Sequence, residues 1–260
     1  MKHTAILRND GQFSAPCRNI KLTVAYDGTA YHGFQRQNNA LAIQEILETR
    51  LSGLFGHSLK ITGAGRTDTG VHAYGQVVNF LTSGSIPAGN ISKAARGLLP
   101  PDIVVTHAEE VPLNFHSRRS AQSKIYIYRV LEAVVADPFS RNYSWHINQP
   151  LDVSRMQAAV QAIVGTHDFS AFRAAGSTPV KPVRTIFSAG CSRKEQLIEF
   201  FFWGNGFLYH MVRNLVGTLI DVGRGRLTGE QFNSVLLSRD RKQAGATAPP
   251  QGLYLKEVRY

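Results

Sequence analysis

The order of the predicted elements is the feature that most limits how this chain can fold. In each half, short strands flank one or two helices, and a long unbroken alternation of strand and helix is missing. A doubly wound parallel sheet needs that alternation, so we do not expect one. The pattern instead predicts an α+β fold of two similar α/β subdomains, with mostly antiparallel sheets and the helices on one face of each.

Hydrophobic periodicity, turn residues and capping residues place the individual elements. The N-terminal half is expected to hold strands at 20–28, 59–62, 74–80 and 103–111, and helices at 42–56 and 90–99. The C-terminal half is expected to hold strands at 124–131, 185–193, 197–203 and 252–258, and helices at 151–165, 207–223 and 228–238. Asp152 is the expected N-cap of the first of these helices, and Thr228 and Gln231 have capping-box spacing at the start of the last. These elements predict a flexible leader at 1–18, an N-terminal subdomain at 19–112 and a C-terminal subdomain at 113–260.

The charge balance points to a polyanionic partner. The 260 residues include 29 Lys and Arg against 18 Asp and Glu, a net charge of +11. Nucleic acid is the first candidate for the partner and an anionic membrane surface the second; a basic protein without either role is the alternative. No apolar run approaches the roughly 18 residues of a membrane span. Cys17 and Cys191 form no CxxC pair, which argues against a zinc site or disulfide framework and fits reduced thiols in the cytoplasm.

The stretch GAGRTDTGVHA, residues 63–73, is the strongest local signal. It is neither a dinucleotide fingerprint, because a strand and not a helix follows, nor a phosphate loop, because Gly-Lys-Ser/Thr is absent. What remains is a tight glycine turn that presents Arg66 and Asp68 to the same side. The pair is either catalytic or a surface ion pair, and a surface ion pair stabilises little.

Two further segments combine aromatic and cationic side chains. In the strand KIYIYRV, Lys124, Tyr126 and Tyr128 share one face, either as a platform for stacked bases or as one side of a half-buried strand. In the helix at 207–223, Leu208, Met211, Val212, Leu215 and Leu219 form the expected core stripe, and His210, Arg213 and Gly217 fall on another face. Arg213 is then either functional or a solvated arginine.

Taken together, the motifs resemble one family. YDGTAYHGFQRQ, GRTDTGVHA, DFSAFR, HMVRNLVGTL and GLYL occur in the order found in bacterial tRNA pseudouridine synthase A, and the resemblance runs from about residue 20 to the end. It implies isomerisation of uridine to pseudouridine at positions 38, 39 and 40 of the tRNA anticodon stem-loop, with no cofactor and no metal. Thr69 stands where the family usually has alanine, a small change beside Asp68.

The resemblance also implies roles for individual residues. Asp68 is the essential acid, and it attacks C6 of the base, attacks C1′ of the ribose, or deprotonates the sugar. Arg213 pairs with this acid, Tyr126 stacks on the target base, Arg66 fills the space left by the extruded nucleotide, and Leu253 lines the base pocket. Further tRNA contacts are implied for Gln35, Arg36, Phe115, His116, Ser117, Arg118, Arg119 and the loop at 176–180.

For the whole molecule, the resemblance implies two α/β subdomains whose sheets join around a central basic cleft, with helices on the outer face. It also implies a homodimer that acts on tRNA in the cytoplasm, without a membrane. Two alternatives stay open at this point. A non-catalytic RNA-binding module would use the face of Tyr126 and Tyr128, and an enzyme for small phosphorylated metabolites would need a phosphate loop that the sequence lacks.

Overall fold

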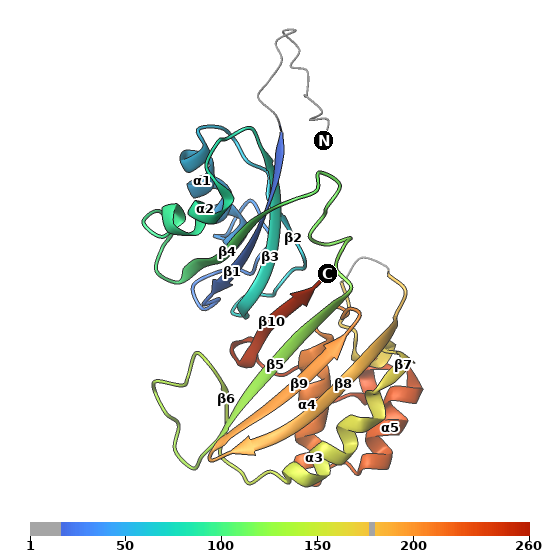
Figure 1. The fold of residues 1–260 in the computed structure, drawn as a ribbon. Coiled ribbons are helices and arrows are strands. Elements are labelled where there is room, and N and C mark those ends of the chain that lie inside the picture. Colours follow the sequence, from blue (N-terminus) through green and yellow to red (C-terminus); the bar gives the residue numbers. More distant parts are fainter. Residues whose placement is uncertain (1–16, 177–179) are drawn as a thin grey trace. The chain divides into compact units, whose positions relative to one another are not determined.

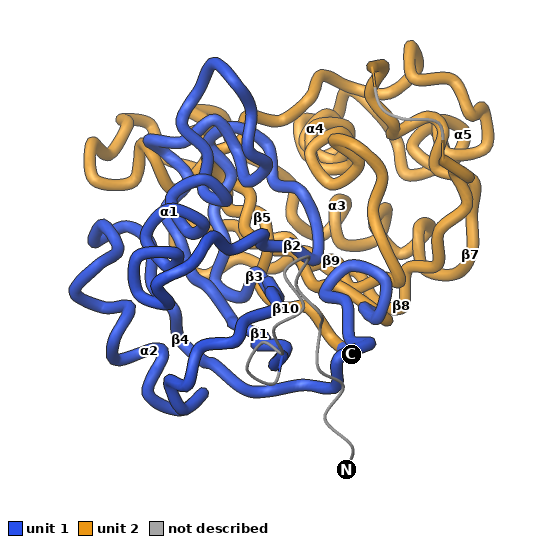
Figure 2. Tube along the Cα trace, turned by 90° about the horizontal axis from the view of Figure 1, so that it is seen from above, with its two compact units in different colours: residues 1–121, 260 blue, residues 122–259 orange. Residues whose placement is uncertain are grey.

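A computed structural model describes residues 17–176 and 180–260. Residues 1–16 of the expected leader and residues 177–179 of the expected tRNA-contacting loop lie outside the described residues. The chain divides into two compact units, drawn in different colours in Figure 2. Unit 1 runs to Ala121 and includes Tyr260, and unit 2 comprises Gln122–Arg259.

Unit 1 is built on an antiparallel sheet in which β1 lies between β3 and β4. Its elements in chain order are β1 (Arg18–Tyr26), α1 (Ile43–Phe55), β2 (Thr62–Gly63), β3 (His72–Thr82), α2 (Ala88–Ala95) and β4 (Ile103–Val111). The short strand β2 pairs antiparallel with β3, through Thr62 opposite Asn79.

Alternation of buried side chains from Ile20 onward along β1 marks one face of the unit 1 sheet. Ile20, Leu22 and Val24 are fully buried, and Ile20 lies opposite Phe80 of β3. Phe80 packs edge-on against Phe55 of α1, with ring centroids 5.3 Å apart. Because successive side chains of a strand point to opposite faces, α1 packs on the face of Ile20, and the face of Asn19 is the other one.

Unit 2 carries a longer antiparallel sheet in the order β10-β5-β9-β8-β7. Its strands are β5 (Ser123–Glu132), β6 (Trp145–Ile147), β7 (Gly165–Asp168), β8 (Val183–Lys194), β9 (Leu197–Gly204) and β10 (Leu253–Arg259). Only β6 runs parallel to its neighbour, the end of β5. The two units therefore confirm the predicted α+β class with mostly antiparallel strands (Figure 1).

The helices of unit 2 are α3 (Val153–Val160), α4 (Met211–Gly223) and α5 (Gly229–Ser238). Helix α4 is the central one, since eleven of its thirteen residues are buried. The predicted N-caps are confirmed. Asp152 accepts a hydrogen bond from the Arg155 N–H at the start of α3, and Thr228 forms a capping box with Gln231 at the start of α5.

Candidate functional site

The turn that carries Asp68 lies between β2 and the start of β3. The chain leaves β2 alongside β3, with the Ala64 N–H donating to Val77 O at 2.8 Å. It then reverses direction in a turn closed by the Val71 N–H, which donates to Asp68 O at 3.1 Å. Gly70 supplies the positive φ of 75° that this reversal requires. Asp68 is thus presented, half-buried, at the N-terminal end of β3.

The segment YDGTAYHGF, residues 26–34, holds this turn in place. The Tyr26 hydroxyl hydrogen-bonds the Thr67 hydroxyl at 2.8 Å, and the Phe34 N–H donates to Thr67 O at 3.1 Å. Gly33, with φ 84°, passes so close to the turn of Asp68 that a Cβ there would lie 2.6 Å from Thr67 O. Two motifs that are about 30 residues apart in the sequence therefore form one structural unit around Asp68.

The phenol of Tyr26 is part of the interior of unit 1. Burial raises its pKa to about 12, although hydrogen bonds with Thr67 and Gln76 oppose the shift. The Gln76 amide also donates to Gly65 O at 2.9 Å, so a second buried side chain supports the strand that leads to the turn. Because the phenol stays protonated at neutral pH, its bond to Thr67 is a neutral one and does not depend on pH in that range.

Arg66 points outward from the same turn. Its Nε donates to Gln35 Oε1 at 3.3 Å, which brings together two residues expected to contact RNA. Arg36, the third of that group, lies at 3.2 Å from Glu48 and 3.9 Å from Glu45, both on α1. The Arg36 side chain is 57% exposed in these ion pairs, so it remains accessible.

In unit 2, Tyr126 and Leu253 share one face of the sheet. In the register of β5 and β10, Tyr126 lies opposite Leu255, and Tyr128 lies opposite Leu253. The Tyr126 ring meets Phe207 edge-on, with centroids 5.0 Å apart. The structure therefore places Tyr126 and Leu253 on adjacent strands and on the same face of the sheet.

Arg213 lies in the first turn of α4 and is held by the segment 246–249. Its Nε donates to Ala248 O at 2.7 Å, and the Ala248 N–H donates back to Arg213 O at 3.1 Å. The helix begins at Met211 rather than at residue 207 as predicted, because His210 adopts a left-handed conformation with φ 59°. A non-glycine residue in this conformation is strained, and such strain is typical of functional sites.

Two of the residues assigned to shared faces are buried rather than accessible. Tyr128 is not available for stacking on RNA, because its ring is fully buried and its hydroxyl donates to Pro249 O at 2.7 Å. Burial raises its pKa well above the ordinary value, and the nearby charge of Arg213 only partly opposes this shift. The face of Gly217 is likewise packed, since a Cβ there would lie 1.8 Å from Ala246 O. Tyr126, on the same face of β5, is 8% exposed.

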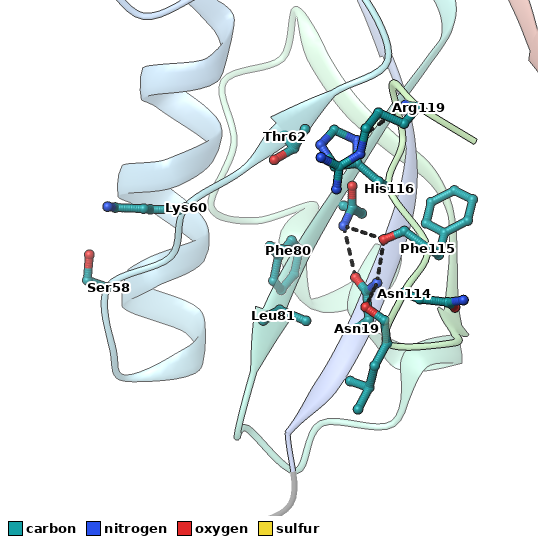
Figure 3. Close-up of a pocket in the computed structure, with 12 residues that line it drawn as sticks. Asn19, Ser58, Lys60, Thr62, Phe80, Leu81, Asn114, Phe115, His116 and Arg119 are labelled. Atoms are coloured by element: carbon teal, nitrogen blue, oxygen red, sulfur yellow. Dashed lines mark hydrogen bonds between the residues drawn. The ribbon is translucent and has the colours of Figure 1, made fainter. Parts of the chain in front are cut away.

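The residues 115–119 lie in unit 1, where Phe115, His116 and Arg119 border a groove of about 670 Å³ (Figure 3). The groove involves two buried residues that sequence analysis missed, Asn19 and Asn79, whose amides bond each other at 3.0 Å. Both asparagines lie inside otherwise apolar strands. Because buried amides need hydrogen-bond partners, this placement was the sequence signal that could have indicated the pair. Ser117 is fully buried and binds Asn79 and Thr62, so its role here is to fix the loop.

Two general observations concern ligands and membranes. In the described part of the chain, no three His, Cys, Asp or Glu side chains gather in an arrangement that could hold a metal ion. No helix among the described residues combines the length and apolar character needed to cross a membrane.

Comparison with known proteins decides the family. The sequence matches the family described as tRNA pseudouridine synthase over residues 22–118 and 159–260, which is most of both units. The chain belongs to the tRNA pseudouridine synthase family. The matched ranges contain Asp68, Arg213 and Leu253 and end before Tyr126 in the first segment, so Tyr126 lies between them.

Full-length relatives agree with this membership of the tRNA pseudouridine synthase family. The chain is 46% identical over 243 residues to tRNA pseudouridine synthase A of Thermoanaerobacter sp. (strain X514), covering 94% of this chain and 100% of the relative. It is 44% identical over 243 residues to tRNA pseudouridine synthase A of Acetivibrio thermocellus, with the same coverage. It is 47% identical over 237 residues to that of Halalkalibacterium halodurans, covering 91% of this chain and 90% of the relative.

Proposed function

We propose that this tRNA pseudouridine synthase uses Asp68 as its essential catalytic acid. The isomerase activity on tRNA uridine follows from the family. The observation that supports Asp68 is the construction of its turn, which Tyr26, Phe34 and Gly33 hold through Thr67. A carboxylate fixed in this way can act as a covalent catalyst, because its geometry relative to the substrate is set before binding.

The reaction breaks the N1–C1′ bond of uridine and forms a C5–C1′ bond. N1 gains a proton and C5 loses one, so atoms balance without an oxidant or a second substrate. Asp68 starts the reaction by attack on C6, by attack on C1′, or by removing a ribose proton. Each of these routes needs the ionised carboxylate, and a neighbouring guanidinium favours that form. We assign this role to Arg213.

We assign the recognition of the target base to Tyr126 and Leu253. Tyr126 stacks on the uracil ring and helps to remove the C5 proton, and Leu253 forms an apolar wall beside it. Their positions on one face of adjacent strands support this assignment. A phenol is suited to both tasks, since it combines a stacking surface with a group that can exchange a proton.

The target uridine must leave its helix before it can be turned over, because a stacked and paired base cannot rotate in place. Base flipping costs a few kcal/mol, which phosphate contacts from lysines and arginines offset. We propose that Arg66, exposed on the turn of Asp68, occupies the vacated space. We further propose that the targets are uridines 38, 39 and 40 of the anticodon stem-loop. Gln35, Arg36, Phe115, His116, Arg118 and Arg119 contact the tRNA, and the buried Ser117 fixes the loop that carries the last four.

We also propose that the enzyme works as a homodimer in the cytoplasm. Sedimentation of the purified protein at micromolar concentration tests the first part, and a monomeric mass would contradict it. Fractionation of cells that express a tagged protein tests the second part, with the protein expected in the supernatant after membranes are removed.

The proposed activity is tested directly by release of tritium from tRNA labelled at C5 of uridine. Purified protein is expected to release tritium without added metal or nucleotide, because C5 loses its proton in every turnover. Mapping of pseudouridine in tRNA from cells that lack the protein should then show losses at positions 38, 39 and 40. Unchanged modification at all three positions would overturn the assignment of the target sites.

A further inference from the structure

Asn214, which follows Arg213 in α4, is a polar side chain with no exposed surface. Its Nδ2 donates to Phe172 O at 2.8 Å, within the segment DFSAFR. Its Oδ1 accepts from the Thr247 hydroxyl at 2.6 Å and from the Arg241 guanidinium at 3.2 Å. One amide of the helix therefore binds two segments that are far apart in the sequence, and its hydrogen bonds offset the cost of burying it.

The directions of these hydrogen bonds follow from the groups that form them. A backbone carbonyl only accepts and a guanidinium only donates, so the amide of Asn214 directs its nitrogen to Phe172 and its oxygen to Arg241. The Thr247 hydroxyl then donates its single proton to the same amide oxygen and accepts from Arg241 at 3.1 Å. Because each group has one consistent role, the network has a single stable arrangement.

Thr247 belongs to a segment that is bound to α4 at successive positions. The Gly245 N–H donates to the Thr218 hydroxyl at 3.0 Å, and the Ala248 N–H donates to Arg213 O at 3.1 Å. Gly245 and Ala248 use their backbones for these bonds, whereas Thr247, which lies between them, uses its side chain. A substitution at Thr247 can therefore loosen the middle of the segment while the groups that form the other two bonds stay in place.

The carbonyl of Ala248, directly after Thr247, limits the direction of the Arg213 guanidinium. Ala248 is fully buried, and its oxygen accepts from Arg213 Nε at 2.7 Å. Because a guanidinium is planar and rigid, a bond at Nε restricts where its two terminal nitrogens can lie. In the proposed function, this guanidinium favours the ionised carboxylate of Asp68. A shift of the Ala248 carbonyl would therefore displace a charge that the reaction uses.

We propose that Thr247 and Asn214 are positioning residues for the isomerisation. Their hydrogen bond fixes the segment that carries Ala248, and Ala248 in turn holds the guanidinium of Arg213. The proposal rests on the proposed function, and it adds two residues that this function does not name. Since Asn214 has no exposed surface, it acts through Arg213 and not by contact with the RNA.

Substitutions of Thr247 test the proposal through the kcat and KM of tritium release from tRNA. Thr247→Val removes the hydroxyl, keeps the shape of the side chain and leaves the bond of Asn214 to Phe172 in place. A misplacement of about 1 Å can cost about 100-fold in rate, so we expect kcat to fall about tenfold or more, with KM nearly unchanged. Thr247→Ser keeps the hydroxyl and should retain most of kcat. The matched control is Thr166→Val, which removes a hydroxyl that bonds Thr185 between β7 and β8 and should leave kcat unchanged.

A double-variant comparison separates positioning of Arg213 from a purely structural role. Lysine has no Nε–H group for Ala248 O to hold, so Thr247→Val should lower kcat much less in an Arg213→Lys background than in wild type. Urea unfolding verifies that each variant is folded in the assay, and Thr247→Ala, which lacks the same hydroxyl, provides a second test with the same expectation.

Three results would overturn the proposal: equal kcat for Thr247→Val and Thr166→Val, equal losses for Thr247→Val and Thr247→Ser, or the same fold loss in both backgrounds. Failure of the proposed function is distinguishable from these results. Wild type would then release no tritium, or Arg213→Ala would keep the kcat of wild type.

Discussion

Thr67, the residue before Asp68, carries two of the contacts that fix the turn of Asp68. Its hydroxyl meets Tyr26 and its carbonyl accepts the Phe34 N–H. Since a catalytic carboxylate must be placed to within a fraction of an ångström, we expect residues that touch only Thr67 to affect the reaction through the position of Asp68. At the scale of single residues, the proposed site therefore includes side chains that need not touch the RNA.

Tyr26→Phe is expected to lower both stability and turnover. Removing the Tyr26 hydroxyl leaves the Thr67 hydroxyl without this partner. The loss should cost about 1 kcal/mol in the free energy of unfolding, measured in urea. The tritium-release rate should fall as the turn loosens. If the unfolding midpoint and the tritium-release rate equal those of wild type, the Tyr26–Thr67 hydrogen bond contributes to neither stability nor turnover.

The same phenol gives a pH dependence whose sign is fixed. Its pKa rises from 10.0 to about 12 on folding, so the protonated form is favoured in the folded state. The resulting stabilisation is complete below pH 10 and is lost as the pH rises toward 12. The stability difference between wild type and Tyr26→Phe should therefore shrink over this interval.

Gly33→Ala tests the close approach of the two motifs. With φ 84° and a Cβ 2.6 Å from Thr67 O, the alanine should strain its own backbone by about 1–2 kcal/mol and displace the turn of Asp68. We expect a lower unfolding midpoint together with a lower kcat. Gly53→Ala is the matched control, because nothing lies within 4 Å of its Cβ in α1. That variant should gain up to about 1 kcal/mol and keep its activity.

At the scale of elements, α4 and the segment 246–249 form the support of Arg213. Gly217, one turn further along the helix, lets this segment lie directly against α4. The reciprocal bonds between Arg213 and Ala248 depend on that approach. The absence of a side chain at Gly217 thus determines where the guanidinium of Arg213 is held.

Gly217→Ala should consequently impair catalysis more than tRNA binding. The added methyl group would lie 1.8 Å from Ala246 O, so the segment must move and the support of Arg213 with it. We expect a marked fall in the single-turnover rate and a small change in Kd. Gly229→Ala, at the start of α5 with open space around it, serves as the control. Equal kinetic behaviour of the two variants would contradict this account of α4.

Elements with strong local signals were predictable from the sequence. The strand at 103–111 matches β4, and the capping box of α5 is confirmed, because alternation and capping are local properties. The start of α4 was not predictable, since the left-handed His210 breaks the helix within an apolar run. The buried Asn19–Asn79 pair was missed for a different reason, because its two members lie 60 residues apart in the sequence.

For the molecule as a whole, we expect the net charge of +11 to dominate the affinity for tRNA. Phosphate contacts release condensed counterions, so they make affinity fall steeply with salt. If about six phosphates are contacted, Kd for tRNA should rise roughly 10³-fold between 50 and 200 mM salt. Titration of labelled tRNA at these concentrations measures the slope. An affinity independent of salt would mean that the positive charge plays no part in recognition.

The central claim is that Asp68 performs the chemistry, and Asp68→Asn tests it most directly. The asparagine is nearly the same size, so the turn and tRNA binding should persist, which a binding titration verifies. Tritium release from tRNA labelled at C5 of uridine should then be undetectable in the variant and rapid in wild type. Release by Asp68→Asn at a rate close to that of wild type would contradict the account.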